Sequence, residues 1–326
     1  MPKISLVIPS YNRKNDLERC IKSILIQNFK DYEIIIVDND SKDKTREFLE
    51  KLKKILKNKL RVILNENNVG ASEARNQALR LINSEYVLFL DSDAELLKKD
   101  VLKQMVNILG KDEKIGQLGG EIIEGKMRIS NSERNEDGCF LWAEKVFMGS
   151  VSCVTTANCI MRTKIIKKIG GFDPYYIYGY EDNDLSWRIR QLGLKCLIDS
   201  RVSAIHHVSF IGRTSNFFRF HRNRVRFLIK KENWLFLLFL PFIDLVTTIK
   251  LAPARVREFA NKPMDKIAWF NNSDKGKKIS SSKLKKILIL GSTYSINLLK
   301  AYIWNILHLN QTLYIRYKNP NFILKK

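Results

Sequence analysis

A short apolar run that ends in two carboxylates constrains this chain more than any other feature. Residues 86–90 are Tyr-Val-Leu-Phe-Leu, and Asp91-Ser92-Asp93 follows at once. A run of this kind predicts a β-strand that is buried on both faces. An unpaired charge inside such a strand would be very costly. We therefore expect Asp91 and Asp93 just beyond the carboxyl end of the strand, which is the edge where open α/β sheets bind ligands.

The two carboxylates predict a site for a cation. Side chains at positions i and i+2 of an extended chain point the same way, so Asp91 and Asp93 would repel each other without a cation between them. A hard divalent ion that also bridges to phosphate oxygens suits this place. The alternative is an acidic turn that caps a helix expected near residues 96–109, and Asp-x-Asp alone does not separate the two interpretations.

Strands and helices alternate over the first 110 residues. Apolar runs predict strands at 4–8, 32–37, 60–64 and 86–90, and helical spacing predicts helices at about 14–27, 45–56 and 71–82. Short links between them indicate an α/β fold with a mostly parallel sheet and helices on both faces. Residues 111–150 are less regular, and we expect mixed or antiparallel structure there. The expected features are a strand at 115–123, a polar surface loop at 126–138, and strands at 139–147, 151–154 and 157–162.

Polar residues follow each of the first strands and should meet at one sheet edge. Asp38 could accept a hydrogen bond from a base N–H or a ribose hydroxyl, although a turn residue is the alternative. Arg75 lies one turn into the helix that Gly70 opens, within reach of a diphosphate at the helix start; its alternative is a surface salt bridge. The chain lacks both the P-loop motif and a Gly-x-Gly-x-x-Gly after the first strand, which disfavours nucleotide hydrolases and dinucleotide dehydrogenases.

A second acidic cluster opens a predicted helix after a loop rich in glycine and tyrosine. Glu181-Asp182-Asn183-Asp184 would be ordinary helix-start chemistry in one interpretation. In the other, a carboxylate at this partly apolar rim is a general base that deprotonates a hydroxyl. Further on, a predicted strand at 202–205 ends in His206-His207, and one of these histidines could be a metal ligand or a hydrogen-bonded structural residue.

The positive charge is concentrated in the last third of the chain. Residues 1–200 carry 33 basic and 29 acidic side chains, whereas residues 201–326 carry 24 and 5, a net charge of +19. Such a tail could bind nucleic acid or an anionic membrane surface. The five cysteines form no Cys-x-x-Cys pair and are odd in number, which fits a reducing cytosol without a disulfide scaffold or zinc site. No apolar leader follows Met1, so we expect a cytoplasmic protein.

The tail predicts helices that contact a membrane. Residues 216–231 form a basic amphipathic helix, and the apolar stretch 234–249 is interrupted by Pro241 and Asp244. It falls short of the roughly 20 apolar residues that a span requires, so a helix in the membrane interface is favoured and a single crossing stays open. A second apolar stretch covers 287–309, after a polar linker at 271–283. The alternative is that these helices pack on the rest of the chain or form a dimer interface.

Taken in order, the motifs resemble those of family 2 glycosyltransferases with the GT-A fold. The resemblance extends over about residues 3–215 and depends on the ordered set rather than on any single motif. The matching segments are Ser5–Arg13, Ile36–Ser41, Asn68–Asn76, Phe89–Asp93, Gly170–Asp173 and Tyr178–Leu185, followed by His206.

The resemblance implies a Rossmann-like GT-A catalytic domain over residues 1–215. Its halves are a nucleotide-sugar-binding part, 1–110, and an acceptor-binding part, 111–215; a basic, apolar helical tail covers 216–326. The implied donor is a nucleoside-diphosphate sugar, with UDP or dTDP favoured. The implied acceptor is a hydroxyl of a lipid-linked or cell-surface glycan at the cytoplasmic face of the membrane.

The resemblance also assigns the donor-binding residues. Pro9, Tyr11 and Asp38 match positions that hold the base and ribose. Arg75 matches a position near the diphosphate, and Asp91 matches the first acid of the motif, which faces ribose or metal-bound water.

The remaining assignments concern the metal and the chemistry. Asp93 and His206 match the ligands of Mn²⁺ or Mg²⁺; the doubled histidine leaves His207 open, and we favour His206. Asp182 matches the catalytic base of an inverting displacement, and Glu181 helps to place the acceptor. Two rival functions are a nucleotide-sugar-binding protein without turnover and a nucleic-acid-binding protein; the chain has no recognised DNA- or RNA-binding signature, which disfavours the second.

Overall fold

We describe the chain from a computed structural model. It describes residues 1–125, 127–129, 131–134, 140–143, 148–177, 179–207, 217–246 and 283–317; among these, the side chains at 127, 129, 131–134, 140–143, 217, 283–294, 316 and 317 are not described. The chain divides into two compact units, and each is described by itself. The first comprises residues 1–133, 140–209 and 320–326, and the second comprises 134–139 and 210–319.

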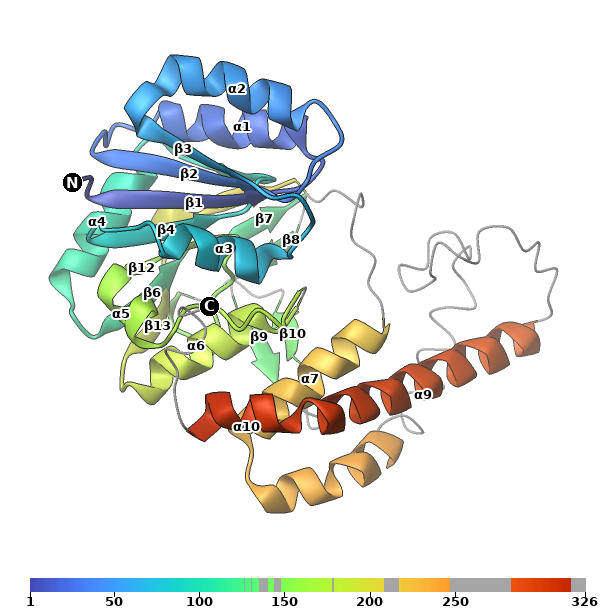
Figure 1. The fold of residues 1–326 in the computed structure, drawn as a ribbon. Coiled ribbons are helices and arrows are strands. Elements are labelled where there is room, and N and C mark those ends of the chain that lie inside the picture. The colour runs from blue at the N-terminus through green and yellow to red at the C-terminus, as the bar shows by residue number, and fades with distance from the viewer. Residues whose placement is uncertain are drawn as a thin grey trace. The chain divides into compact units, whose positions relative to one another are not determined.

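An eight-stranded sheet is the centre of the first unit (Figure 1), in the order β11-β13-β6-β12-β4-β1-β2-β3. Its strands are β1 (Ile4–Ser10), β2 (Tyr32–Asp38), β3 (Leu60–Leu64), β4 (Tyr86–Leu90), β6 (Ile115–Gly119), β11 (Gly149–Ser150), β12 (Asn158–Arg162) and β13 (Lys195–Ile198). β1 pairs in parallel with β2 and β4, and β2 pairs in parallel with β3. β12 is antiparallel to β4 and β6. The predicted α/β fold with a mostly parallel sheet is confirmed.

Helices cover both faces of this sheet (Figure 1). α1 (Lys14–Leu25), α2 (Thr45–Leu56) and α4 (Val101–Lys111) share one apolar core with Leu6 and Leu88. α3 (Ala71–Leu79), α5 (Thr163–Lys168) and α6 (Glu181–Gln191) share the other with Val7 and Phe89. Successive residues of a strand point to opposite faces. A strand between two helical layers therefore needs an uninterrupted apolar run, and all five residues of β4 are buried.

A smaller sheet in the same unit has the order β5-β14-β7-β8. Its strands are β5 (Ala94–Leu96), β14 (Ala204–His206), β7 (Ile122–Glu124) and β8 (Met127–Ile129). Two predictions were wrong here: the helix expected from residue 96 begins at Val101, after β5, and the strand expected over 115–123 is two strands. Gly120 and Glu121 separate them, and position 120 requires glycine because a Cβ there would lie 2.1 Å from the carbonyl oxygen of Val202.

The polar stretch at 126–138 also differs from the predicted loop. It contains β8 and β9 (Asn131–Arg134), and β9 pairs with β10 (Phe140–Ala143). The strand expected over 151–154 is absent from these described residues, and β11 ends just before them.

The second unit contains α7 (Phe217–Lys231), a helix over 234–246, α9 (Lys283–Leu307) and α10 (Leu309–Tyr317). A buried polar network joins them. The guanidinium of Arg224 and the hydroxyl of Tyr302 both donate to Asp244, and Arg226 donates to Thr312 Oγ1 at 2.6 Å. The basic residues of α7 were expected to form the polar face of an amphipathic helix. That prediction was wrong for Arg222, Arg224, Arg226 and Lys230, which are buried.

Among the described residues, no helix combines the length and the apolar character that a membrane crossing requires. The linker predicted over 271–283 lies outside the described residues, apart from its last position.

Candidate active site

The two aspartates that follow β4 lie in a tight turn. The amide of Ala94 donates to the carbonyl oxygen of Asp91 at 2.9 Å, and β5 begins at Ala94. The expectation that an extended chain would align the two carboxylates was therefore wrong, although the turn still brings both to one place. Asp93 is buried and Asp91 is half-buried.

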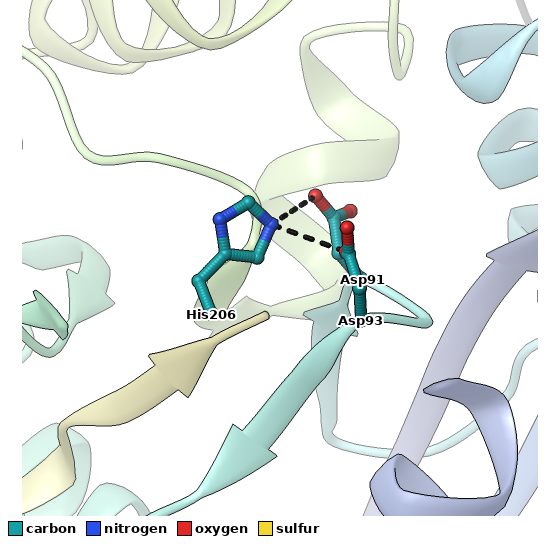
Figure 2. A group of neighbouring side chains, drawn as sticks. All are labelled: Asp91, Asp93 and His206. Atoms are coloured by element: carbon teal, nitrogen blue, oxygen red, sulfur yellow. Dashed lines mark hydrogen bonds and ion pairs between the residues drawn. The ribbon is translucent and has the colours of Figure 1, made fainter. Parts of the chain in front are cut away.

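His206 completes the group (Figure 2). β14 pairs antiparallel with β5 so that His206 lies opposite Ala94, beside the turn. Its Nε2 lies 3.1 Å from Asp93 Oδ1 and 3.9 Å from Asp91 Oδ2. One ligand atom from each of the three residues lies within 4.8 Å of the others, close enough for the three to hold one metal ion. His207 has a different partner, Glu95 Oε2 at 2.9 Å, and takes no part in this group.

Charged neighbours surround this group. Burial lowers the pKa of His206, but the hydrogen bonds that its ring donates to Asp93 and Glu124 outweigh burial and raise that pKa to about 10. Arg13 forms an ion pair with Asp93 Oδ2. The acidic turn is thus paired with two basic side chains, His206 and Arg13. Carboxylates that directly follow a buried strand are expected to have such partners.

Arg75 is buried on α3 and contacts the other side of Asp91. Its Nη2 donates to Asp91 Oδ1 at 2.6 Å, and the guanidinium lies over the Phe172 ring at 5.4 Å. The Nε and Nη1 groups have no hydrogen-bond partner among the described residues. The surface salt bridge considered from the sequence does not describe this side chain. A buried guanidinium with unpaired donors suits an anionic ligand.

The second acidic cluster lies at the start of α6. Asp182 Oδ1 accepts hydrogen bonds from the Thr156 amide at 3.0 Å and from Thr156 Oγ1 at 2.6 Å. Burial and the charge of Asp182 raise the pKa of Glu181 to about 8. Burial also raises the pKa of Asp182, against the opposing effects of Arg75 and the Thr156 hydrogen bonds. A carboxyl with a raised pKa is what a general base at neutral pH requires.

The two clusters lie at the same place in the first unit. The Asp91 amide donates to the carbonyl oxygen of Ala157 at 3.1 Å, and Ala157 follows Thr156, the partner of Asp182. The charges of Arg75 and Asp91 also act on the pKa of Asp182. Asp93 and Asp182 are thus connected through a short set of direct contacts.

The ends of β1 and β2 form the neighbouring part of the sheet edge. Ser10 pairs with Asp38, and Asp38 Oδ2 accepts from the Ser41 amide at 3.1 Å and from Arg46 Nε at 3.0 Å. Asp38 Oδ1 is buried and has no partner among the described residues. Pro9 is buried in β1, which continues one residue beyond it, and Tyr11 is exposed. A free carboxylate oxygen here can accept from a ligand N–H or O–H.

Two residues that shape the site had no assigned role in the sequence analysis. Thr156 fixes Asp182, and Asn76 holds the loop before α6: its Oδ1 accepts from the Phe172 amide and its Nδ2 donates to the Phe172 carbonyl oxygen, both at 2.8 Å. Asn76 lies four residues after Ser72 and three before Leu79, so helical spacing places it on the buried face. This helical spacing could have identified Asn76 as a buried polar residue from the sequence alone. No pattern in the sequence indicates a role for Thr156.

An α/β sheet of this topology with an acid turn after its central strand defines the GT-A class. The family model described as glycosyl transferase family 2 matches residues 5–170, half of the chain, so the chain belongs to this family. One relative is the GalNAc(5)-diNAcBac-PP-undecaprenol β-1,3-glucosyltransferase of Campylobacter jejuni, 42% identical over 98 residues, which are 30% of this chain and 31% of the relative. Another is the poly(ribitol-phosphate) β-N-acetylglucosaminyltransferase TarP of Staphylococcus aureus, 38% identical over 136 residues, 39% of each chain. The matches span well under half of these relatives.

Solved structures share the fold at low sequence identity. GalNAc-T7 with UDP, GalNAc and Mn²⁺ has a TM-score of 0.59 at 19% identity, over 70% of this chain and 48% of that one. The mannosyltransferase PcManGT of Pyrobaculum calidifontis, in complex with GDP-Man and Mn²⁺, has a TM-score of 0.55 at 17% identity, over 94% and 87%. These similarities confirm the predicted GT-A fold.

Proposed function

We propose that the chain is a metal-dependent, inverting glycosyltransferase that moves a sugar from a nucleoside diphosphate to an acceptor hydroxyl. The supporting observation is the connection of two acidic centres, Asp91 and Asp93 with His206 on one side and Asp182 on the other, through Arg75 and Thr156. A donor phosphate and an acceptor hydroxyl need such neighbouring centres. The catalytic domain is proposed to cover residues 1–215 and the tail 216–326.

The donor would lie along the edge formed by β1, β2 and β4. Asp38, with its free buried oxygen, would accept from the base or ribose, and Pro9 and Tyr11 would border that place. A carboxylate that accepts from an imide N–H favours a uracil or thymine base, so UDP or dTDP is the preferred carrier. The unpaired donors of Arg75 would face the diphosphate.

The residues present fit a divalent cation. Two carboxylates and one imidazole form a hard, mainly oxygen donor set, which suits Mn²⁺ or Mg²⁺. Asp93 and His206 would bind the ion directly, and Asp91 would face ribose or a bound water. Such an ion, when bound, offsets negative charge on the leaving diphosphate. The two structural neighbours, GalNAc-T7 and PcManGT, are both complexes with Mn²⁺, which supports this choice.

Asp182 would take the proton of the acceptor hydroxyl. The two hydrogen bonds from Thr156 hold Oδ1, and Oδ2 would face the acceptor. Attack on the anomeric carbon from the face opposite the diphosphate is one displacement, so it inverts the configuration. Glu181, next to Asp182 and largely neutral at pH 7 because its pKa is raised to about 8, would donate a hydrogen bond that places the acceptor.

A panel of nucleotide sugars tests the proposal. Calorimetric titration of wild type with UDP-, dTDP- and GDP-sugars should show binding that strengthens with Mn²⁺, and Asp93→Asn should lose the effect of the metal. A donor that binds but is neither transferred nor hydrolysed would favour the rival function, a nucleotide-sugar-binding protein without turnover. Tight, salt-dependent binding of nucleic acid without affinity for any nucleotide sugar would refute the proposal.

We further propose that the tail places the enzyme on an anionic membrane surface. The helix over 234–246 turns Leu240 and Asp244 inward and exposes an apolar stripe: Trp234, Leu235, Leu238, Phe239, Phe242 and Leu245. α9 exposes Ile296, Leu299, Ile303, Ile306 and Leu307. Between these two helices in the sequence, residues 247–282 carry 8 basic and 3 acidic side chains. Exposed apolar residues beside excess positive charge fit a helix that lies in a lipid interface.

An acceptor in the membrane agrees with this location. The name of the Campylobacter jejuni relative gives an undecaprenol-linked acceptor, and that of TarP gives poly(ribitol-phosphate). A lipid-linked or cell-surface glycan at the cytoplasmic face is therefore the proposed acceptor class.

Vesicle flotation tests the membrane proposal. Wild type should float with vesicles that contain phosphatidylglycerol and much less with phosphatidylcholine alone, and Leu238→Lys should reduce flotation. Ile55→Lys is the matched control, since Ile55 is an equally exposed apolar side chain on α2. Equal flotation of the two variants and wild type would refute the assignment of this stripe, and a dimer that dissociates in Leu238→Lys would assign it to a second copy instead.

A further inference from the structure

The ring of His206 lies between two carboxylates, one of which is outside the proposed metal-ligand set. Its Nε2 faces Asp93, and its Nδ1 lies 2.6 Å from Glu124 Oε1. Glu124 is the last residue of β7 and is 17% exposed. Neither the fold nor the relatives described above assign it a role.

We propose that Glu124 is the positioning residue of the metal site. It accepts the Nδ1–H of His206 and so presents the lone pair of Nε2 to a cation at Asp91 and Asp93. This inference rests on the metal-dependent function proposed above. An imidazole that ligates a metal must be neutral, with one N–H and one lone pair, and the hydrogen bond at one nitrogen decides which is which. A carboxylate partner also makes the imidazole a better ligand.

The sheet itself fixes this contact. β14 and β7 are parallel, with Ala204 opposite Ile122 and Ile205 opposite Ile123, so His206 and Glu124 come next on both strands. Their side chains project from the same face, since neighbours in register share a face. β8 lies on the other side of β7 and pairs Met127 with Glu124, which fixes the backbone at this position. The carboxylate therefore reaches the ring without any rearrangement.

The neighbouring histidine provides a matched comparison. His207 Nε2 pairs with Glu95 Oε2 at 2.9 Å, so the same two residue types meet one position further along the chain. That pair is about one-third exposed and is not part of the group formed by Asp91, Asp93 and His206. Removal of Glu95 removes the same charge without touching the ring of His206.

Mn²⁺ affinity of the full chain, measured by the electron paramagnetic resonance signal of free Mn²⁺, tests the assignment. Glu124→Met should weaken binding by about 10- to 100-fold, the usual effect of losing the partner of a ligating histidine. Glu124→Gln should lose less, because its amide oxygen still accepts from Nδ1–H. Glu95→Met should bind as wild type does. Thermal melting of each variant shows that the fold is retained.

The other possible results distinguish a failure of the role of Glu124 from a failure of the proposed metal site. Wild-type affinity in Glu124→Met, equal losses in the two Glu124 variants, or an equal loss in Glu95→Met would overturn the role of Glu124 and leave the proposed enzyme intact. If Glu124→Met does not fold, wild-type affinity in Glu124→Gln overturns it. Failure of wild type to bind Mn²⁺ at all would refute the proposed metal site, and this inference with it.

Discussion

Replacement of Asn76 by alanine should destabilise the first unit much more than the same replacement of its neighbour Gln77. The Asn76 side chain is fully buried and makes two hydrogen bonds of 2.8 Å to the backbone of Phe172. Alanine leaves a buried N–H and a buried C=O without partners, at about 1–3 kcal/mol each, so we expect a loss of about 2–6 kcal/mol. That is a large share of the roughly 5–15 kcal/mol by which a domain is stable.

Gln77→Ala is the control for this prediction. Gln77 also makes two side-chain hydrogen bonds, both with Asn65 at 3.0 Å, but it is only half-buried. Water can replace those partners, so the expected cost is below about 1 kcal/mol.

Two measurements test these predictions. Urea unfolding gives the change in the free energy of unfolding, and amide hydrogen exchange of the peptide containing residues 170–177 reports whether the loop opens more often. If Asn76→Ala and Gln77→Ala lower the free energy of unfolding equally and the exchange of that peptide is unchanged, the two hydrogen bonds between Asn76 and Phe172 contribute nothing to stability.

Three further predictions concern the chemistry. Asp182→Asn should lower kcat by about 100-fold or more with an unchanged melting temperature, because the amide oxygen can still accept from Thr156; wild-type kcat would remove Asp182 from the role of base. Asp93→Asn should weaken Mn²⁺ binding and turnover together, and turnover lost at unchanged affinity would contradict a ligand role. The raised pKa of Asp182 should make kcat/KM increase with pH above the usual carboxyl range, as the base loses its proton, and a profile flat from pH 5 to 8 would contradict it.

Much of the fold follows from hydrophobic periodicity, and the exceptions have a common cause. The predicted strands at 60–64 and 86–90 and the helix at 45–56 match the structure residue for residue. Short strands such as β5 were missed, because three residues give no measurable period and the pairing partner, β14, is more than 100 residues away. Long-range pairing decides such elements, and local sequence does not record it.

The candidate site was predictable in its residues and less so in its geometry. The sequence placed Asp91, Asp93 and His206 after strand ends, and the structure brings them within reach of one ion. The turn that aligns the two aspartates depends on the hydrogen bond to Ala94 and on the pairing of β5, which no spacing rule indicates. The position of Glu124 likewise depends on the register of β7 beside β14.

The tail shows why a count of charges does not identify a surface. Basic residues alternate with apolar ones along α7, a pattern that predicts an amphipathic helix with a basic polar face. Arg224 and Arg226 instead point inward and bond to Asp244 and Thr312. Burying a guanidinium is costly unless it is paired. A change such as Asp244→Ala would leave the buried Arg224 without this partner and should therefore destabilise the helical unit. In the proposed membrane-bound state, attraction to anionic lipid would come from residues outside this network, and the proposed binding would depend on the exposed apolar stripe around Leu238.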